Sequence, residues 1–98
     1  MMYYQGDIIK IEGINQELVV VSKDIYNKTD QVVVCLITKE KKTDPLAVEI
    51  MYEKKKAYVL CDQIRHFDLF VRGSKKVGEV SLAERLEIAD VIQALFEY

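Results

Sequence analysis

The 98-residue sequence contains no tryptophan, one proline, four glycines and a single histidine. So little glycine and proline, together with a 50% share of hydrophobic residues, argues against a disordered or low-complexity chain. No apolar run approaches the ~20 residues of a membrane helix, and the N-terminus lacks the basic and apolar segments of a signal peptide. We therefore expect one domain over residues 1–98, located in the cytoplasm and without a membrane partner.

Cysteine is also scarce, with Cys35 and Cys61 each lying inside an apolar run. Free cysteine behaves as a small hydrophobic residue, and the cytoplasm is reducing, which favours two buried thiols over a disulfide. One histidine and no Cys-x-x-Cys pair give a zinc site little support. We expect no metal and no cofactor.

The formal net charge of −2 is not typical of a nonspecific nucleic-acid binder, which carries a basic surface. The charge is unevenly distributed, because basic residues cluster in residues 39–42, 53–56 and 72–76. Such clusters can attract phosphates locally, although lysine-rich loops also serve simply to solvate turns.

Five segments have the composition and alternation of strands. They cover residues 6–13, 17–23, 31–38, 46–52 and 56–64. The short link "GINQ" predicts a hairpin between the first two, and the most apolar segment, 31–38, is the expected central strand. Residues 24–30, "DIYNKTD", are polar and predict a loop.

The C-terminal segment "SLAERLEIADVIQALFEY" (81–98) changes to helical periodicity. Ser81 and Glu84 have the spacing of a capping box, which predicts where this helix begins. Its apolar stripe is expected to be core or a dimer interface. The whole pattern predicts a mainly β, α+β fold: a small antiparallel sheet or barrel of about five strands with a C-terminal helix packed on it.

Residues 58–72, "YVLCDQIRHFDLFVR", place many polar groups at the end of an apolar run. If the strand continues, Gln63 and Arg65 project from the same face. If a turn follows, Arg65 and Asp68 can form an ion pair that fixes it, with His66 at the surface. The same residues also suit a phosphodiester, because arginine offers a planar fork to phosphate and a carboxylate or imidazole can move a proton.

RNA supplies its own nucleophile, the 2′-OH, so an enzyme that orients it and stabilises the charged intermediate needs no metal. Thr38, at the end of the predicted central strand, adds a hydroxyl donor. A ribonuclease site and a structural ion pair are therefore the two interpretations of the polar cluster.

Four motifs resemble, in the same order, those of the PemK/Kid and MazF toxins of bacterial toxin–antitoxin systems. They are "GDII", "LVVVSKDIYN", "VVVCLITKEKKTDPLAVEI" and "YVLCDQIRHFDLFVRGSKK". The resemblance covers nearly the whole chain. It implies a homodimer of SH3-like β-barrels and a sequence-specific, metal-independent endoribonuclease. Such an enzyme cleaves single-stranded RNA by 2′-OH attack, leaves a 2′,3′-cyclic phosphate and a 5′-OH, and is bound by a cognate antitoxin.

The resemblance also implies roles for individual residues. Arg65 and Asp68 match the arginine and aspartate of a PemK-type active site, and Thr38 matches the threonine of a MazF-type site. The expected RNA-binding residues are Gln63, which matches a groove position, and His66, Lys39, Lys41, Lys42 and Arg72.

The segment "EGINQELVVV" departs from the family pattern, which has a longer loop ending in Arg-Pro. Here Gln16 and Glu17 stand at those positions. This departure keeps a second interpretation open, a catalytically weakened relative that binds RNA or protein. A third is an SH3-like interaction module with no role in RNA chemistry.

Overall fold

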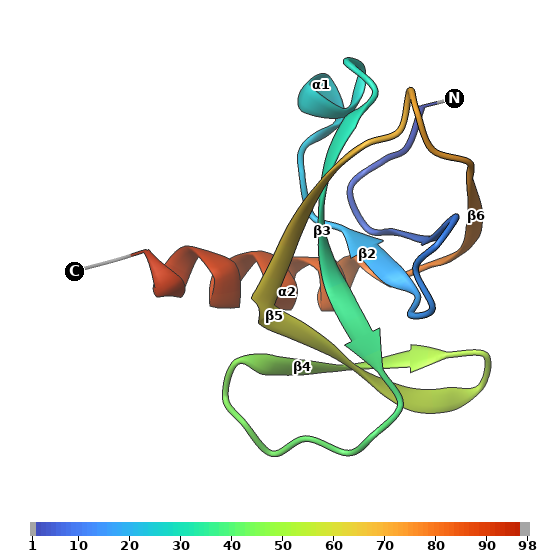
Figure 1. The fold of residues 1–98 in the computed structure, drawn as a ribbon. Helices are drawn as coiled ribbons and strands as arrows, with labels where there is room; N and C mark the ends of the chain where they lie inside the picture. The colour runs from blue at the N-terminus through green and yellow to red at the C-terminus, as the bar shows by residue number, and fades with distance from the viewer. Residues whose placement is uncertain (1, 97–98) are drawn as a thin grey trace.

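The computed structural model describes residues 2–96, which form one antiparallel sheet and two helices (Figure 1). The strands are β1 (Asp7–Ile11), β2 (Leu18–Val20), β3 (Gln31–Thr38), β4 (Ala47–Tyr52), β5 (Lys55–Asp68) and β6 (Ser74–Glu79). Helix α1 (Asp24–Asn27) joins β2 to β3, and α2 (Leu82–Leu95) ends the fold. No helix within residues 2–96 has the length and apolarity to cross a membrane.

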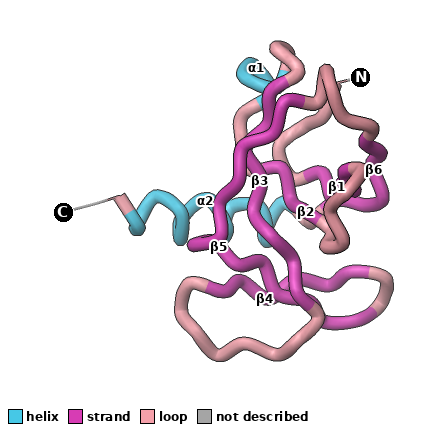
Figure 2. The backbone as a smooth tube through the Cα atoms, in the orientation of Figure 1, coloured by secondary structure: helices cyan, strands magenta, loops and turns pink. Residues whose placement is uncertain are grey.

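The strand order is β4-β5-β3-β2-β1-β6, and the sheet curls so that its two edges approach each other (Figure 2). A Cβ on Gly78 of β6 would lie 3.1 Å from Cε1 of Tyr52 in β4, so a glycine at this position permits the close approach. The expected mainly β fold with a C-terminal helix, the β1–β2 hairpin and the interior position of residues 31–38 are all confirmed.

Three expectations from the sequence are wrong in detail. The last expected strand, 56–64, runs on to Asp68, with a register shift opposite Cys35 and Leu36 that marks a bulge. Residues 74–79 form the edge strand β6, so the sheet has six strands where about five were expected. The lysines that made this segment resemble a solvated loop are typical of edge strands, which they protect from further pairing.

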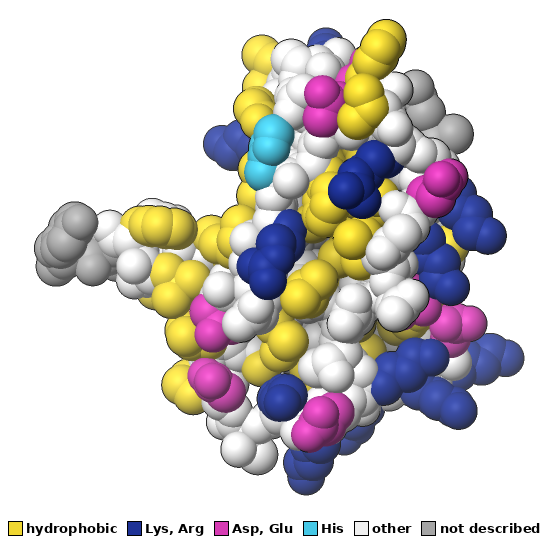
Figure 3. Space-filling view, in the orientation of Figure 1, with side chains coloured by type: hydrophobic (Ala, Val, Ile, Leu, Met, Phe, Trp, Pro, Cys, Tyr) yellow, Lys and Arg dark blue, Asp and Glu magenta, His cyan; other side chains and the backbone are white. Residues whose placement is uncertain are grey.

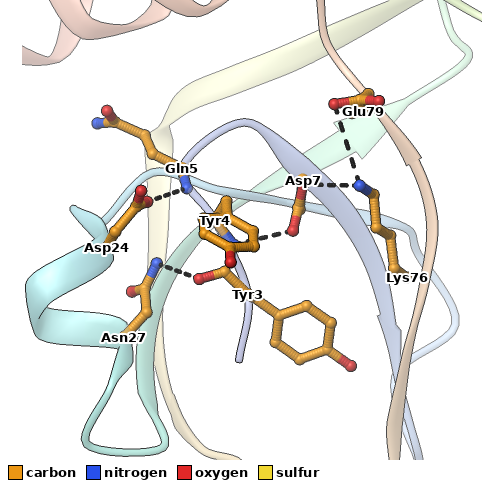
Figure 4. A network of polar contacts seen from close by, with 8 residues as sticks. All are labelled: Tyr3, Tyr4, Gln5, Asp7, Asp24, Asn27, Lys76 and Glu79. Atoms are coloured by element: carbon orange, nitrogen blue, oxygen red, sulfur yellow. Dashed lines mark hydrogen bonds and ion pairs between the residues drawn. The ribbon is translucent and has the colours of Figure 1, made fainter. Parts of the chain in front are cut away.

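The predicted polar loop 24–30 contains α1, a helix of four residues held by side-chain contacts. Asp24 accepts a hydrogen bond from the backbone N–H of Gln5 (2.8 Å), and buried Asn27 donates to the carbonyl of Tyr3 (3.1 Å; Figure 4). A helix this short depends on such tertiary contacts, because one turn cannot offset its own nucleation cost.

The other end of the N-terminal segment is fastened by Asp7, whose side chain is buried. Its carboxylate accepts from the backbone N–H of Tyr4 (2.8 Å) and lies 3.2 Å from Nζ of Lys76 in β6 (Figure 4). The hydrogen bond to Asp7 raises the pKa of Lys76. The chain before β1 is thus tied to both α1 and β6.

The predicted capping box begins α2. Ser81 accepts from the N–H of Glu84 (3.1 Å), and Glu84 accepts from the N–H of Ser81 (2.8 Å). The second carboxylate oxygen of Glu84 accepts from the N–H of Met51 (2.8 Å), which fixes the start of the helix to edge strand β4. The C-terminal half of α2 projects beyond the sheet (Figure 1). Residues 97–98 of the expected helix lie outside the described residues.

The sheet buries apolar side chains on both faces. The helix-side face packs against Ile88 of α2 and includes Ile8, Val19, Cys35, Ile37, Ile50 and Cys61. The opposite face includes Tyr3, Ile9, Ile11, Leu18, Val20, Val32 and Val34. Cys35 and Cys61 are free and buried, as the sequence predicted.

Candidate nucleic-acid interface

The continuation of β5 to Asp68 decides how the polar cluster of residues 58–72 is arranged. Arg65 pairs with Val34 and Phe67 pairs with Val32 across β3. Because directly paired residues point to the same side of a sheet, Arg65 and Phe67 lie on the opposite face, away from α2.

Arg65 is exposed, and within the described residues its guanidinium forms hydrogen bonds to neutral groups. It donates to the carbonyl of Ile64 (3.2 Å) and to Oε1 of Gln63 (3.4 Å), so the expected joint projection of Gln63 and Arg65 is confirmed. None of the ion pairs formed within residues 2–96 involves Arg65. Three of its five N–H donors are thus unused, and its charge is available to an anion.

The expected ion pair between Arg65 and Asp68 is not formed. The two residues are three positions apart in a strand, so their side chains leave it on opposite faces. Asp68 instead accepts from the backbone N–H of Phe70 (2.9 Å) in the turn that follows β5. His66, on the same side of β5 as Asp68, packs edge-on against Tyr26 of α1, with ring centroids 6.4 Å apart.

Thr38 lies on the same face as Arg65, at the end of β3. It pairs with Tyr58, and its hydroxyl accepts from the backbone N–H of Glu40 (3.1 Å). It lies four positions after Val34, the partner of Arg65, which corresponds to ~13 Å along the strand. Arg65 and Thr38 therefore bound a strip of surface. We call it the Arg65–Thr38 strip; it comprises Gln63, Arg65, Leu36, Leu60 and Thr38.

The basic residues of the β3–β4 loop continue from this strip. Lys39 and Lys41 are exposed, and Lys42 lies 3.9 Å from Glu40. Figure 3 shows Lys and Arg side chains gathered near the end of β3 and the β4–β5 turn, with apolar side chains between the more isolated cations of this face. The structure thus places the predicted lysines beyond the Thr38 end of the strip.

Arg72 marks the other end. It follows β5 in the loop to β6, where its guanidinium lies 5.4 Å from the ring centroid of Phe67 and donates to the carbonyl of Glu12 (3.3 Å). Glu12 begins the short β1–β2 link, in which Gln16 is exposed and Glu17 lies 3.9 Å from Lys10. Within the described residues, no group of three or more His, Cys, Asp or Glu side chains is placed to hold a metal ion.

A second feature lies on the helix side of the sheet, between α1 and α2. It is a groove of about 700 Å³, lined largely by apolar side chains that include Val33, Ile64, Ile88 and Ile92. At its rims, Ile25 of α1 is 77% exposed and Phe96 is 69% exposed.

The expected apolar stripe of α2 is therefore only partly core. Ile88 is buried, and Val91 and Ile92 pack against the helix-side cluster, whereas Leu82 and Leu86 remain exposed with Phe96. The α1 side of the groove could not be predicted, since Ile25 and Tyr26 are isolated apolar residues in a polar segment.

Solved structures share this fold. The protein of a MazE–MazF complex from Deinococcus radiodurans matches with a TM-score of 0.85 and 20% identity, over 97% of this chain and 96% of the other. An endoribonuclease from Mycobacterial species matches with a TM-score of 0.81 and 23% identity, over 96% and 90%. An endoribonuclease in complex with its cognate antitoxin, also from Mycobacterial species, matches with a TM-score of 0.82 and 22% identity, over 98% of both chains.

None of the curated proteins is similar enough in sequence to count as a match. The sequence model of one family, described as the PemK-like, MazF-like toxin of type II toxin-antitoxin system, matches residues 5–96. That match includes every strand and both helices of the fold. The chain therefore belongs to the PemK-like, MazF-like toxins of type II toxin–antitoxin systems.

Proposed function

We propose that this toxin is a metal-independent, sequence-specific endoribonuclease that cleaves single-stranded RNA, including mRNA, in the cytoplasm. The observation that carries the proposal is the exposed, uncompensated guanidinium of Arg65 on a strand face that also presents Gln63. An arginine held by neutral acceptors keeps its full charge for a phosphodiester.

In the proposed reaction the 2′-OH of the RNA attacks the adjacent phosphorus atom. The P–O bond to the 5′-oxygen of the next nucleotide breaks, and this oxygen takes up a proton from water, which leaves a 2′,3′-cyclic phosphate and a 5′-OH. Arg65 stabilises the negative charge that develops on the phosphoryl oxygens. Thr38 and Gln63 bind the RNA along the strip, because both face the same side of the sheet as Arg65.

The proton of the 2′-OH needs an acceptor, for which the proposal names Asp68. Its Oδ1 is engaged by the N–H of Phe70 (2.9 Å). The side chain of Asp68 leaves β5 on the face away from Arg65. Its carboxylate therefore has to reach the 2′-OH of the RNA past the end of the strand. His66 lies on that same side of β5, and with Lys39, Lys41, Lys42 and Arg72 it completes the proposed RNA-binding set.

The experiment is incubation of the purified protein with mixed-sequence single-stranded RNA in EDTA, followed by sequencing of the ends. We expect cleavage at a defined motif with 5′-OH ends. Cleavage should be lost in Arg65→Ala, strongly reduced in Asp68→Asn, and retained in Lys28→Ala, which removes an exposed charge next to α1. Full activity of Arg65→Ala would reject the site, and full activity of Asp68→Asn would reject only the proton acceptor.

A second candidate function follows from the short β1–β2 link, in which Gln16 and Glu17 occupy the positions of the family's Arg-Pro. A toxin-like fold without that cation binds RNA or protein and cleaves slowly or not at all. Tight RNA binding by the wild-type protein without any cleavage in the experiment above would favour it.

We also propose two protein partners. A second copy of this chain covers the groove between α1 and α2, because Phe96 and Ile25 are otherwise exposed at its rims. A cognate antitoxin covers the Arg65–Thr38 strip with an acidic or apolar segment, and so competes with RNA for the cations there. Competition between purified antitoxin and RNA, weakened by Arg65→Ala, tests the second partner.

A further inference from the structure

Arg72 contacts two other parts of the chain. Its guanidinium covers the ring of Phe67 at 5.4 Å, and Nη1 donates to the carbonyl of Glu12 (3.3 Å). The next residue, Gly73, accepts from the backbone N–H of Glu12 (2.8 Å). A Cβ on Gly73 would lie only 2.7 Å from a carboxylate oxygen of Glu12, so the loop passes directly over the β1–β2 link.

The ring of Phe67 supports this guanidinium from below. Phe67 packs against the apolar cluster of the opposite face, where its partner Val32 is buried. The ring of Phe67 thus lies between the buried cluster and the guanidinium of Arg72. Arg72 itself is exposed to solvent.

This stack lies beside the proposed site of phosphate binding. Phe67 and Arg65 are two residues apart on the same face of β5, which corresponds to ~7 Å along a strand. A single nucleotide spans a distance of this order. A phosphate at Arg65 therefore brings the base of a neighbouring nucleotide within reach of Arg72.

We infer that the Arg72 guanidinium, backed by Phe67, is a stacking platform for the nucleobase next to the cleaved phosphodiester. Bases in single-stranded RNA commonly stack on arginine planes and aromatic rings. The inference rests on the proposed ribonuclease function and assigns to it one nucleotide subsite.

The geometry favours a base over the carboxylate of an acidic peptide. A carboxylate binds arginine through the N–H groups at the edge of the guanidinium. Nη1 is already engaged by the carbonyl of Glu12, and the half-buried ring of Phe67 beside the guanidinium offers a base an aromatic surface that a carboxylate does not use. Among the ion pairs of the described residues, none involves Arg72, so its charge also remains to attract RNA.

The test uses short RNA oligonucleotides with 2′-O-methyl groups, which remove the nucleophile and allow binding to be measured without cleavage. A 2-aminopurine base is placed at each position in turn, since its fluorescence reports stacking. For the wild-type protein we expect a fluorescence change concentrated at one position next to the scissile phosphate.

Two conservative variants then separate stacking from charge and folding. Arg72→Lys keeps the charge but loses the plane, and Phe67→Leu keeps an apolar side chain but loses the ring. Each should weaken RNA binding about tenfold or more and abolish the fluorescence change at that position. The salt dependence of RNA binding should stay unchanged in Arg72→Lys, because the charge is kept. The control variant Lys75→Ala removes a nearby exposed charge and should leave the fluorescence change intact.

Wild-type affinity and an unaltered fluorescence change in Arg72→Lys would overturn the inference, including when Phe67→Leu is too unstable to measure. If the platform is overturned in this way but the wild-type protein still binds RNA, the ribonuclease proposal is not affected. Failure of the wild-type protein to bind any single-stranded RNA would reject the proposed function, and the platform with it.

Discussion

The two faces of the sheet are built from the same strands but have different surfaces. On the helix side, Cys35 and Ile37 join a buried cluster completed by Ile88, and the surface left open is the apolar groove. On the opposite face, an equally apolar cluster gives way at the end of β5 to Arg65, with Thr38 at the end of β3. The contact with a second copy is thus expected on the helix side, and the contact of Arg65 with the phosphate on the opposite face.

Strand β5 connects the two surfaces. Ile64 lines the groove, and the adjacent Arg65 points to the opposite face. Because neighbouring residues in a strand face opposite sides, a second copy that presses on Ile64 also fixes the backbone of Arg65. The proposed dimer surface and the proposed site therefore meet at two adjacent residues of β5, and substitutions on either face probe each of them.

The largest effect on association is expected from a charged substitution in the apolar groove between α1 and α2. Phe96→Asp places a charge on an exposed groove wall, and a buried aromatic contact is commonly worth a hundredfold or more in affinity. We expect the dimer dissociation constant to rise about 100-fold, measured by sedimentation over a dilution series.

Phe70→Asp is the matched control, since Phe70 is 81% exposed but does not line the groove. It should leave the dissociation constant unchanged. Equal weakening by both substitutions would show that exposure, and not the groove, determines association.

Thr38→Val tests the opposite face without changing the shape of the side chain. A lost hydrogen bond to a charged phosphate reduces cleavage by about 10- to 100-fold, while the thermal midpoint should change little because Thr38 is only partly buried. Thr29→Val removes a hydroxyl that donates to Tyr26 (2.8 Å), away from the strip, and should cleave RNA like the wild type. Unaltered cleavage in Thr38→Val would exclude its hydroxyl from the reaction.

The helix-side core has a pH dependence of its own. Burial raises the pKa of Cys35 to about 12 and that of Cys61 to about 11, from the ordinary thiol value of 9.0. Below pH 9 both states keep these protons, whereas between about pH 9 and 11 only the unfolded chain releases them, so the folded state loses stability as pH rises. From pH 9 to 10 the two thiols should cost about 2 kcal/mol.

Urea unfolding of the wild type and of Cys35→Ala/Cys61→Ala at both pH values measures this loss. Other groups of the chain also change charge at alkaline pH. The decisive quantity is therefore the difference between the two proteins in the unfolding free energy that each loses from pH 9 to 10. The double variant should lose less stability than the wild type over this interval, and parallel losses would refute the contribution of the thiols.

The strands were predictable to the extent that their apolar residues alternate. In β1, Ile8 lies on one face while Ile9 and Ile11 lie on the other, as a period of two requires. β6 was missed because its lysines satisfy the requirements of an edge strand and of a solvated loop equally well. Its pairing with β1 is nonlocal and leaves no mark in the segment itself.

The candidate site was predicted as a set of residues but not as an arrangement. Spacing alone left Arg65 and Asp68 free to pair in a turn, because the sequence did not show that β5 continues to Asp68. The contact between Arg72 and Phe67 depends on how the β5–β6 loop folds back, which local patterns do not determine. For the same reason, local patterns did not predict that the apolar residues of α1 line the groove.

The smallest effect is expected at the β4–β5 turn, which belongs to neither face. Glu53 and Lys54 have φ values of 53° and 65°, a left-handed conformation that two-residue hairpins usually assign to Asn-Gly. Glu53→Asn/Lys54→Gly should relieve this strain and stabilise the fold by about 1 kcal/mol, seen as a thermal midpoint about 4–8 °C higher.

Asp30→Gly is the control, because Asp30 has a similar φ of 63° but aspartate tolerates this conformation better. An equal gain in both variants, or none in the turn variant, would show that side-chain strain does not limit stability there.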